Sequence, residues 1–279
     1  MEVFDSYESL KKVLNEGVGS IGMVPTMGAL HEGHLSLIRR AAQENERVLI
    51  SIFVNPTQFE DASDLINYPK TLAEDLKAIA SIASKIYVYV PKTNDIYGQN
   101  VLAETFDLSD LDQVMEGSKR KNHFQGVATI VKFFLETFKP KKAYFGQKDY
   151  QQLQIISQLA EKLNLNTEII GCPIVREVDG LAMSSRNKHL TPAERKIAPL
   201  VFKALLEIKE MSKNKKYPFL KSFINVFFVE HSQLELDYFV IANSKTLLEI
   251  SDQDKAREGR AFIAVRLGKI RLIDNLDLA

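Results

Sequence analysis

The sequence has 279 residues, of which 45% are hydrophobic and 26% are charged, and these values are ordinary for a globular protein with one large or two modest domains. Its 36 basic and 36 acidic residues give a formal net charge of zero, so composition supports neither a nucleic-acid partner nor a solvated acidic tail. The single cysteine, Cys172, excludes an internal disulfide framework and a multi-cysteine zinc site, and its apolar surroundings favour a buried structural thiol.

No apolar run approaches the roughly 18 residues that a membrane-spanning helix needs. The first residues, Met-Glu-Val-Phe-Asp, have neither the basic nor the apolar region of a signal peptide. We therefore expect a cytoplasmic protein without a membrane partner.

The first part of the chain alternates strand and helix patterns. Helices are expected over 6–16, 33–45 and 71–82, and strands over 20–24, 47–54 and 86–90, with Pro25 ending the first strand. This rhythm predicts an open parallel sheet with right-handed crossovers, in which ligands bind beyond the carboxyl ends of the strands. The polar segments 25–34 and 55–58 follow two such ends.

The later part of the chain changes from an alternating pattern to an α+β pattern. In chain order we expect a loop over 94–121 with a short helix at 111–115, a helix over 126–138 and a strand at 143–145. A helix over 150–163 and a strand over 167–175 are expected next. Asp179-Gly180 predicts a hairpin turn. A helix over 192–211 with Thr191 as N-cap and Glu194 completing a capping box, a helix over 219–231, and strands near 236–242, 261–267 and 270–274 follow. We place a domain boundary close to Ile174–Arg176.

Two glycines and two histidines follow the first strand, in the segment Met27 to His34. The start of a helix presents N–H donors and the positive end of the peptide dipoles, which suits a phosphate group. His31 and His34 are three residues apart, so both side chains can reach such a phosphate from one side. A His-x-x-His pair alone is equally compatible with two surface histidines or with half of a metal site.

Three further polar clusters come later, and each has an ordinary structural interpretation. They are Asn55 with Gln58, Gly146 to Asp149 with Gln152, and Met183 to Arg186. Taken singly, these are a turn, a solvated ion pair and a flexible connector. Taken together with His31 and His34, they complete a set in which histidines meet a phosphate and a lysine and a guanidinium can neutralise the charge developing on leaving pyrophosphate.

Longer strings carry a family resemblance. His31-Glu-Gly-His34 matches the His-x-Gly-His signature of the adenylate-forming nucleotidyltransferases, and Met183-Ser-Ser-Arg186 resembles their second phosphate-covering loop. The segments 24–34, 51–59, 123–126, 145–152 and 179–187 together resemble the pantoate–β-alanine ligase (pantothenate synthetase) family, in that family's order and spacing. The resemblance covers nearly the whole chain.

The resemblance implies a ligase that forms pantoyl adenylate from ATP and pantoate and then transfers the pantoyl group to β-alanine. It implies a Rossmann-like nucleotide- and pantoate-binding domain over 1–174, a smaller α+β lid domain over 175–279, a homodimer, and Mg²⁺ bound mainly through the phosphates of ATP. The catalytic residues would be His34, as proton donor, and His31. ATP would contact Met27, Gly28, Ala29, Leu30, His31, Glu32, Gly33, His34, Gly146, Gln147, Lys148, Asp149, Val175, Met183, Ser184, Ser185 and Arg186. Pantoate would contact Gln58 and Gln152 with Asn55 nearby, and Arg120 and His123 match positions near the cleft.

The chain departs from the usual family pattern at three places. Gln147 stands where Glu is usual, Gln125 stands where Arg is frequent, and Lys121-Asn122 replaces a frequent Pro-Gly. None of these changes removes a histidine or a substrate-contacting glutamine.

Three other functions remain as alternatives. The first is another small-molecule nucleotidyltransferase of the same superfamily, which would need cations for a second phosphate near the acceptor. The second is a small tRNA synthetase or other RNA-binding protein, which the zero net charge and short chain disfavour. The third is a nucleotide-binding regulator without turnover.

Overall fold

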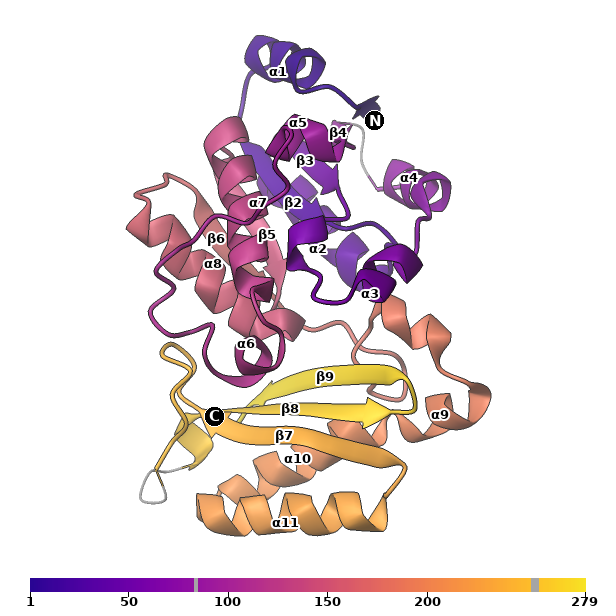
Figure 1. Cartoon of the computed structure of the whole chain (residues 1–279), viewed down its shortest axis with the longest axis vertical. Helices are drawn as coiled ribbons and strands as arrows, with labels where there is room; N and C mark the ends of the chain where they lie inside the picture. Colours follow the sequence, from indigo (N-terminus) through magenta and orange to yellow (C-terminus); the bar gives the residue numbers. More distant parts are fainter. Residues whose placement is uncertain (83–84, 252–255) are drawn as a thin grey trace. The chain divides into compact units, whose positions relative to one another are not determined.

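The computed structural model describes residues 1–82, 85–251 and 256–279, which form two compact units (Figure 1). Unit 1 comprises Met1–Gln147 and Gln151–Pro173. Unit 2 comprises Lys148–Tyr150 and Ile174–Ala279. The short segment Lys148–Tyr150 therefore belongs to unit 2, although the chain on both sides of it belongs to unit 1.

Unit 1 is built on a six-stranded parallel sheet with the strand order β1-β4-β3-β2-β5-β6. The strands are β1 (Glu2–Phe4), β2 (Ile21–Thr26), β3 (Arg47–Ile52), β4 (Ile86–Tyr89), β5 (Lys142–Gly146) and β6 (Glu168–Cys172). From β2 the chain continues to β3 and β4 on one side, and only later to β5 and β6 on the other. The strand order thus reverses between β2 and β5. Open α/β sheets bind their ligands at such a switch point, beyond the carboxyl ends of the strands.

Helices cover both faces of this sheet. On one face Ile50 of β3 shares a buried cluster with Ile38 of α2 (Glu32–Glu44) and Ile79 of α4 (Leu72–Ala80). On the other face the ring of Tyr89 lies 5.4 Å from that of Phe138 in α7 (His123–Phe138). Burial on both sides explains why β3 reads as a continuous apolar run rather than an alternating one.

The remaining elements of unit 1 are mostly short. They are α1 (Tyr7–Glu16), η1 (Pro56–Gln58), α3 (Ala62–Asn67), α5 (Thr93–Tyr97), α6 (Met115–Lys119) and α8 (Tyr150–Lys162) from its second residue on. The single turn η2 (Gln147–Asp149) precedes α8, and its last two residues belong to unit 2. The start of α7 packs directly on η1, because Gly126 has no side chain. A Cβ atom at Gly126 would lie 2.4 Å from the carbonyl oxygen of Thr57.

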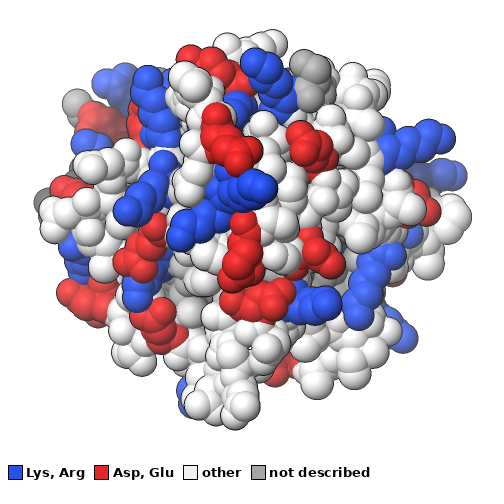
Figure 2. Space-filling model, turned by 90° about the horizontal axis from the view of Figure 1, so that it is seen from above, with Lys and Arg blue, Asp and Glu red and all other residues white. Residues whose placement is uncertain are grey.

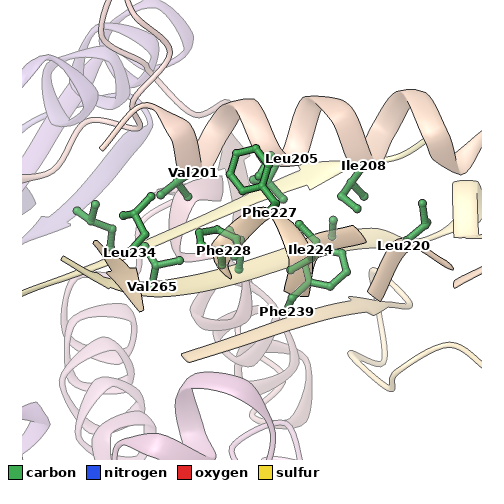
Figure 3. Packing of buried hydrophobic residues seen from close by; sticks show 14 of the residues in the cluster. Val201, Leu205, Ile208, Leu220, Ile224, Phe227, Phe228, Leu234, Phe239 and Val265 are labelled. Atoms are coloured by element: carbon green, nitrogen blue, oxygen red, sulfur yellow. The ribbon is translucent and has the colours of Figure 1, made fainter. Parts of the chain in front are cut away.

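Unit 2 contains a three-stranded antiparallel sheet, β7 (Leu234–Ala242), β8 (Arg260–Leu267) and β9 (Ile270–Asp277). Helices α10 (Leu200–Ser212) and α11 (Tyr217–Glu230) bring their apolar side chains into one cluster with those of the strands, including Leu205, Phe227 and Val265 (Figure 3). The other elements are η3 (Ser185–His189), α9 (Pro192–Ile197) and η4 (Ala256–Glu258).

The predicted α/β fold, with a parallel sheet followed by an α+β part, is confirmed. The capping box of Thr191 and Glu194 is also confirmed, and Arg176 pairs with Ala182 as expected for a hairpin. The Cys172 thiol is buried as predicted, and this burial raises its pKa.

The expected end of one strand and the expected continuity of one helix are wrong, and both differences occur at a proline. Strand β2 continues through Pro25 to Thr26, because β5 pairs with β2 only at Gly22 and Met23 and leaves that edge open beside the proline. The single helix expected over 192–211 is divided into α9 and α10, because Pro199 has no N–H and its ring clashes with the preceding turn.

Several boundaries also differ from expectation. Helix α7 begins at His123 rather than at 126, after Asn122 takes a left-handed conformation with φ of 60°. The short helix expected at 111–115 lies at Met115–Lys119. The pattern gave no indication of β1, α3 or α5.

Charged side chains are mixed on the face seen in Figure 2, where basic and acidic residues alternate over the surface, as the zero net charge leads one to expect. Among the described residues, no helix is both long and apolar enough to cross a membrane.

Candidate active site

The turn after β2 is held by a buried carboxylate from a distant part of the chain. Gly28 and Ala29 both have positive φ, at 78° and 50°. Asp75 of α4 accepts the N–H of Ala29 at 2.9 Å and the N–H of Leu30 at 2.7 Å, and its side chain is only 2% exposed. The hydroxyl of Thr71 donates to the same carboxylate. Asp75 therefore fixes the path by which the chain enters α2.

Sequence reasoning missed Asp75, although a signal was present. Leu72, Leu76 and Ile79 define the apolar face of α4, and position 75 lies on that face at helical spacing. An acidic residue at such a position needs hydrogen-bond donors when it is buried. The two N–H groups it binds are 45 and 46 residues earlier in the chain, so the pattern alone does not identify them.

The two histidines cap the start of the helix that carries them, so the N–H groups of His31 and Gly33 are bound by ring nitrogens within the turn. Nδ1 of His31 accepts the N–H of Gly33 at 3.1 Å, and Nδ1 of His34 accepts the N–H of His31 at 3.3 Å. Their ring centroids are 4.1 Å apart. Gly33 allows this packing, since a Cβ there would lie 2.8 Å from Cε1 of His31.

These caps determine which ring nitrogens carry protons. A nitrogen that accepts a backbone N–H has no proton of its own, so the proton of each neutral imidazole is on Nε2. His31 and His34 consequently offer two Nε2–H donors from one helix start. The neighbouring Glu32 is engaged by Arg39, and the hydrogen bond from that guanidinium lowers the pKa of the Glu32 carboxyl.

Gln58 lies in η1, after the end of β3, and its amide is bound on both sides. Its Oε1 accepts from Nδ2 of Asn55 at 3.2 Å, and its Nε2 lies 3.0 Å from the sulfur of Met27. The structure thus brings together Met27, Asn55 and Gln58, which sequence analysis placed in two separate clusters.

The backbone of Gln58 is held by α7. Nδ1 of His123 lies 2.8 Å from the carbonyl oxygen of Gln58, and Nε2 of the same ring lies 3.0 Å from Nη1 of Arg120. Because a guanidinium only donates and a carbonyl only accepts, the ring is neutral with its proton on Nδ1. Arg120 and His123 therefore act on the conformation of η1.

The strand end after β5 supplies the remaining unit 1 candidates. Gly146 ends β5, Gln147 follows in η2, and Gln152 is half-buried in the first turn of α8. Its neighbour Gln151 is buried and holds the backbone of residues 111–116 by three hydrogen bonds. The two adjacent glutamines thus have different environments, and only Gln152 is partly exposed.

In unit 2, two residues of β9 bind the segments that carry Lys148 and the predicted serine–arginine loop. The amide of Asn275 donates to the carbonyl oxygen of Lys148 at 3.0 Å, and Lys148 itself lies 3.9 Å from the carboxylate of Asp149. The adjacent Asp274 receives two hydrogen bonds from Arg176, at 2.6 and 3.0 Å. Burial raises the pKa of Asp274, and the Arg176 guanidinium opposes that shift.

Arg176 in turn orders the hairpin that leads to the serine–arginine loop. It donates to the carbonyl oxygen of Gly180 and stacks on the ring of Phe202 at 3.6 Å. Val175 accepts the N–H of Met183 at 3.0 Å, so both predicted residues are part of the hairpin. Ser184 caps η3 by accepting the N–H of Arg186, and Ser185 is buried.

The departures from the family pattern have local explanations at two positions. Gln125 binds the N–H and carbonyl of Phe106 and the carboxylate of Asp112, so an amide holds this segment. Asn122 adopts the left-handed conformation that glycine takes readily, and asparagine tolerates it better than most residues.

A cavity of about 510 Å³ opens in unit 1 beside the turn. Met27, Gly28 and Phe53 line it at the ends of β2 and β3, and Thr71 and Asp75 line it from α4. His34, Gln58 and Gln152 are not among its lining residues. It therefore shares Met27 and Gly28 with the residues predicted to contact ATP.

The fold and site define the chain as an α/β protein with a Rossmann-like parallel sheet whose switch point carries a His-x-Gly-His helix start. Comparison with known proteins identifies the family to which the chain belongs. The family model described as pantoate-beta-alanine ligase matches residues 2–277. The chain belongs to the pantoate–β-alanine ligase family, and it is a ligase.

Relatives support this assignment over whole chains. The pantothenate synthetase of Christiangramia forsetii is 45% identical, covering 97% of this chain and 95% of its own, and that of Flavobacterium psychrophilum is 43% identical with full coverage of both. The crystal structure of pantothenate synthetase from Thermus thermophilus matches with a TM-score of 0.93 at 35% identity, covering 100% of this chain and 99% of its own. The pantoate–β-alanine ligase of Francisella tularensis, solved with beta-gamma ATP and β-alanine, matches with a TM-score of 0.82 at 35% identity, covering 100% and 98%.

Replacing Asp75 by Asn tests the role of the buried carboxylate. The amide has one acceptor oxygen and would turn a donor toward Ala29 N–H or Leu30 N–H. Leaving a buried N–H unsatisfied costs about 1–3 kcal/mol, so the free energy of unfolding in urea should fall by that amount and turnover should fall with it. Glu74→Gln, on the exposed face of the same helix, is the matched control. An Asp75→Asn protein with wild-type stability and turnover would contradict this role.

Proposed function

We propose that this ligase uses ATP to condense pantoate with β-alanine and that the reaction proceeds through pantoyl adenylate. A carboxylate oxygen of pantoate attacks the α-phosphorus of ATP, the bond between that phosphorus and the bridging oxygen breaks, and pyrophosphate leaves. The amine of β-alanine then attacks the acyl carbon, the bond between that carbon and the phosphate oxygen breaks, AMP leaves, and the amine proton passes to water as the amide bond forms. The products are pantothenate, AMP and pyrophosphate.

The observation that carries this proposal is the pair of caps made by Nδ1 of His31 and of His34 at the start of α2, from which we infer an Nε2–H donor on each ring. A carboxylate is already a nucleophile, so the first step needs no general base. It needs orientation of the two reactants and stabilisation of the charge that develops on the phosphates. Two neutral imidazole donors provide such stabilisation, with His34 as the principal donor and His31 assisting.

We propose that pantoate is held by Gln58 and Gln152, with Asn55 supporting Gln58. Amide groups orient a carboxylate and hydroxyl groups without adding negative charge. This matters because the carboxylate must approach a polyanion. The bound state of the Gln58 amide, between Asn55 and Met27, supports its role as a fixed contact.

ATP would contact the segment Met27 to His34, then Gly146 to Asp149, Val175 and Met183 to Arg186. Lys148 and Arg186 supply positive charge for the phosphates, and the ordering of the hairpin by Arg176 and Asp274 supports a defined loop. Closure of this loop over the reactants would protect the acyl adenylate from water. The second unit would thereby act as a lid.

Magnesium would bind mainly to the phosphates of ATP. Within the described part of the chain there is no group of three or more His, Cys, Asp or Glu side chains that could hold a metal ion. Magnesium in nucleotide-dependent enzymes commonly relies on substrate phosphates with few protein ligands, so these residues fit that arrangement. We also propose that the enzyme is a cytoplasmic homodimer.

The role of His34 is tested by three substitutions with different chemistry. His34→Ala should lower turnover by at least about 10²-fold, the typical cost of losing one such donor. Asn at this position keeps an acceptor near the place of Nδ1, whereas Gln keeps a donor near the place of Nε2. His34→Asn should therefore resemble His34→Ala, and His34→Gln should retain more activity. The measurement is steady-state turnover together with the melting temperature.

The matched control is His231→Ala at the end of α11, which should leave turnover unchanged. If His34→Asn turned over at a rate close to that of the wild type, the Nε2–H donor would have no part in catalysis.

The pantoate contact is tested by Gln58→Ala. A hydrogen bond to a charged group contributes about 1.5–3 kcal/mol, so the KM for pantoate should rise roughly 10- to 100-fold while that for ATP changes little. Gln113→Ala, an exposed glutamine, serves as the control. An increase confined to the KM for ATP would move Gln58 to the nucleotide site.

A further inference from the structure

The amide orientation of Gln58 is determined by a chain of hydrogen bonds that starts outside the predicted substrate residues. Nδ2 of Asn55 lies 3.0 Å from the carbonyl oxygen of Gly126. A backbone carbonyl accepts hydrogen bonds and does not donate them, so Asn55 must direct its NH₂ group toward Gly126. The oxygen of the Asn55 amide must then point the other way.

That oxygen meets two hydroxyl groups. Oδ1 of Asn55 is 3.0 Å from the hydroxyl of Thr57 and is also hydrogen-bonded by the hydroxyl of Tyr97, the last residue of α5. The two hydroxyls are 2.9 Å from each other. Asn55 is 1% exposed, so these contacts replace water. The pKa of Tyr97 is raised by burial, and its hydroxyl keeps the proton that it donates.

The second hydrogen of the Asn55 NH₂ group fixes Gln58. Nδ2 of Asn55 lies 3.2 Å from the amide of Gln58, so the Gln58 atom that receives this hydrogen must be the carbonyl oxygen Oε1. The NH₂ group of Gln58 is consequently turned to the side of Met27, 3.0 Å from its sulfur. Thioether sulfur is a weak acceptor, and a substrate oxygen would be a stronger one.

We propose that Tyr97 is a positioning residue whose hydroxyl, by donating to Asn55 Oδ1, holds Asn55 in the orientation set by the Gly126 carbonyl and thereby keeps the Gln58 NH₂ group turned to the acceptor oxygens of the acid substrate. The chain of contacts runs from Tyr97 to Asn55 Oδ1, and from Asn55 Nδ2 to Gln58 Oε1. Rotation of either amide by 180° would place two donors or two acceptors against each other. This inference rests on the proposed role of Gln58 as a pantoate contact.

A Tyr97→Phe substitution removes the hydroxyl and keeps the ring, which packs near Phe53 with ring centroids 6.5 Å apart. Because one ordinary hydrogen bond is lost, the KM for pantoate should rise about three- to tenfold while the KM for ATP stays unchanged. Thr57→Val, which removes the second hydroxyl without changing side-chain shape, should raise the same KM. Tyr87→Phe, on β4 against Phe4, is the matched control.

The decisive experiment is a double-mutant cycle of Tyr97→Phe with Gln58→Ala, read as the KM for pantoate, the KM for ATP and kcat in folded proteins. If Tyr97 acts through Gln58, Tyr97→Phe should change the pantoate KM by less than about twofold in the Gln58→Ala background. An effect of equal size in both backgrounds would overturn the inference, because it would show a role independent of Gln58.

Failure of the two proposals can be distinguished. If Gln58→Ala raises the pantoate KM but Tyr97→Phe and Thr57→Val do not, the positioning inference is wrong and the role of Gln58 stands. If Gln58→Ala leaves the pantoate KM unchanged, the proposed pantoate contact is wrong and the inference falls with it.

Discussion

The carboxylate of Asp75 is the contact on which the arrangement of the site depends. It binds two consecutive N–H groups in a turn whose residues have positive φ, and so determines where β2 delivers the chain into α2. The rings of His31 and His34 are then oriented by caps within that helix start. A displacement of the turn would move both donors together, since the helix carries them as one body. The positions of the two histidine rings thus depend on a residue more than 40 positions later in the chain.

The same principle recurs at the other polar clusters. Gln58 is oriented by Asn55, and its backbone is held by His123. In unit 2, adjacent residues of β9 hold the Lys148 segment and, through Arg176, the hairpin before the serine–arginine loop. The backbone segments that carry several candidate side chains are therefore held by polar contacts from other elements. Fully satisfied buried networks of this kind restrict side-chain geometry, which suits a reaction that depends on orientation.

Local pattern was sufficient for the fold class and insufficient for the contacts that shape the site. The apolar run at β3 and the caps of α9 are determined by neighbouring residues, and both were predictable. The strand expected to end before Pro25 continues through it, and the helix expected to run through Pro199 is divided there, because the outcome depends on whether the missing N–H has a partner in the folded chain. Asp75 and Tyr97 act on residues more than 40 positions away, and no local rule pairs them. The functional roles of the candidate residues came from motif resemblance, and they stay predictions.

The central claim is that this enzyme forms an acyl adenylate before the amine reacts. Exchange of labelled pyrophosphate into ATP tests it most directly, because exchange requires a reversible first step that releases pyrophosphate. The account predicts exchange that needs pantoate and proceeds without β-alanine. Exchange in the absence of pantoate, or exchange that requires β-alanine, would contradict it.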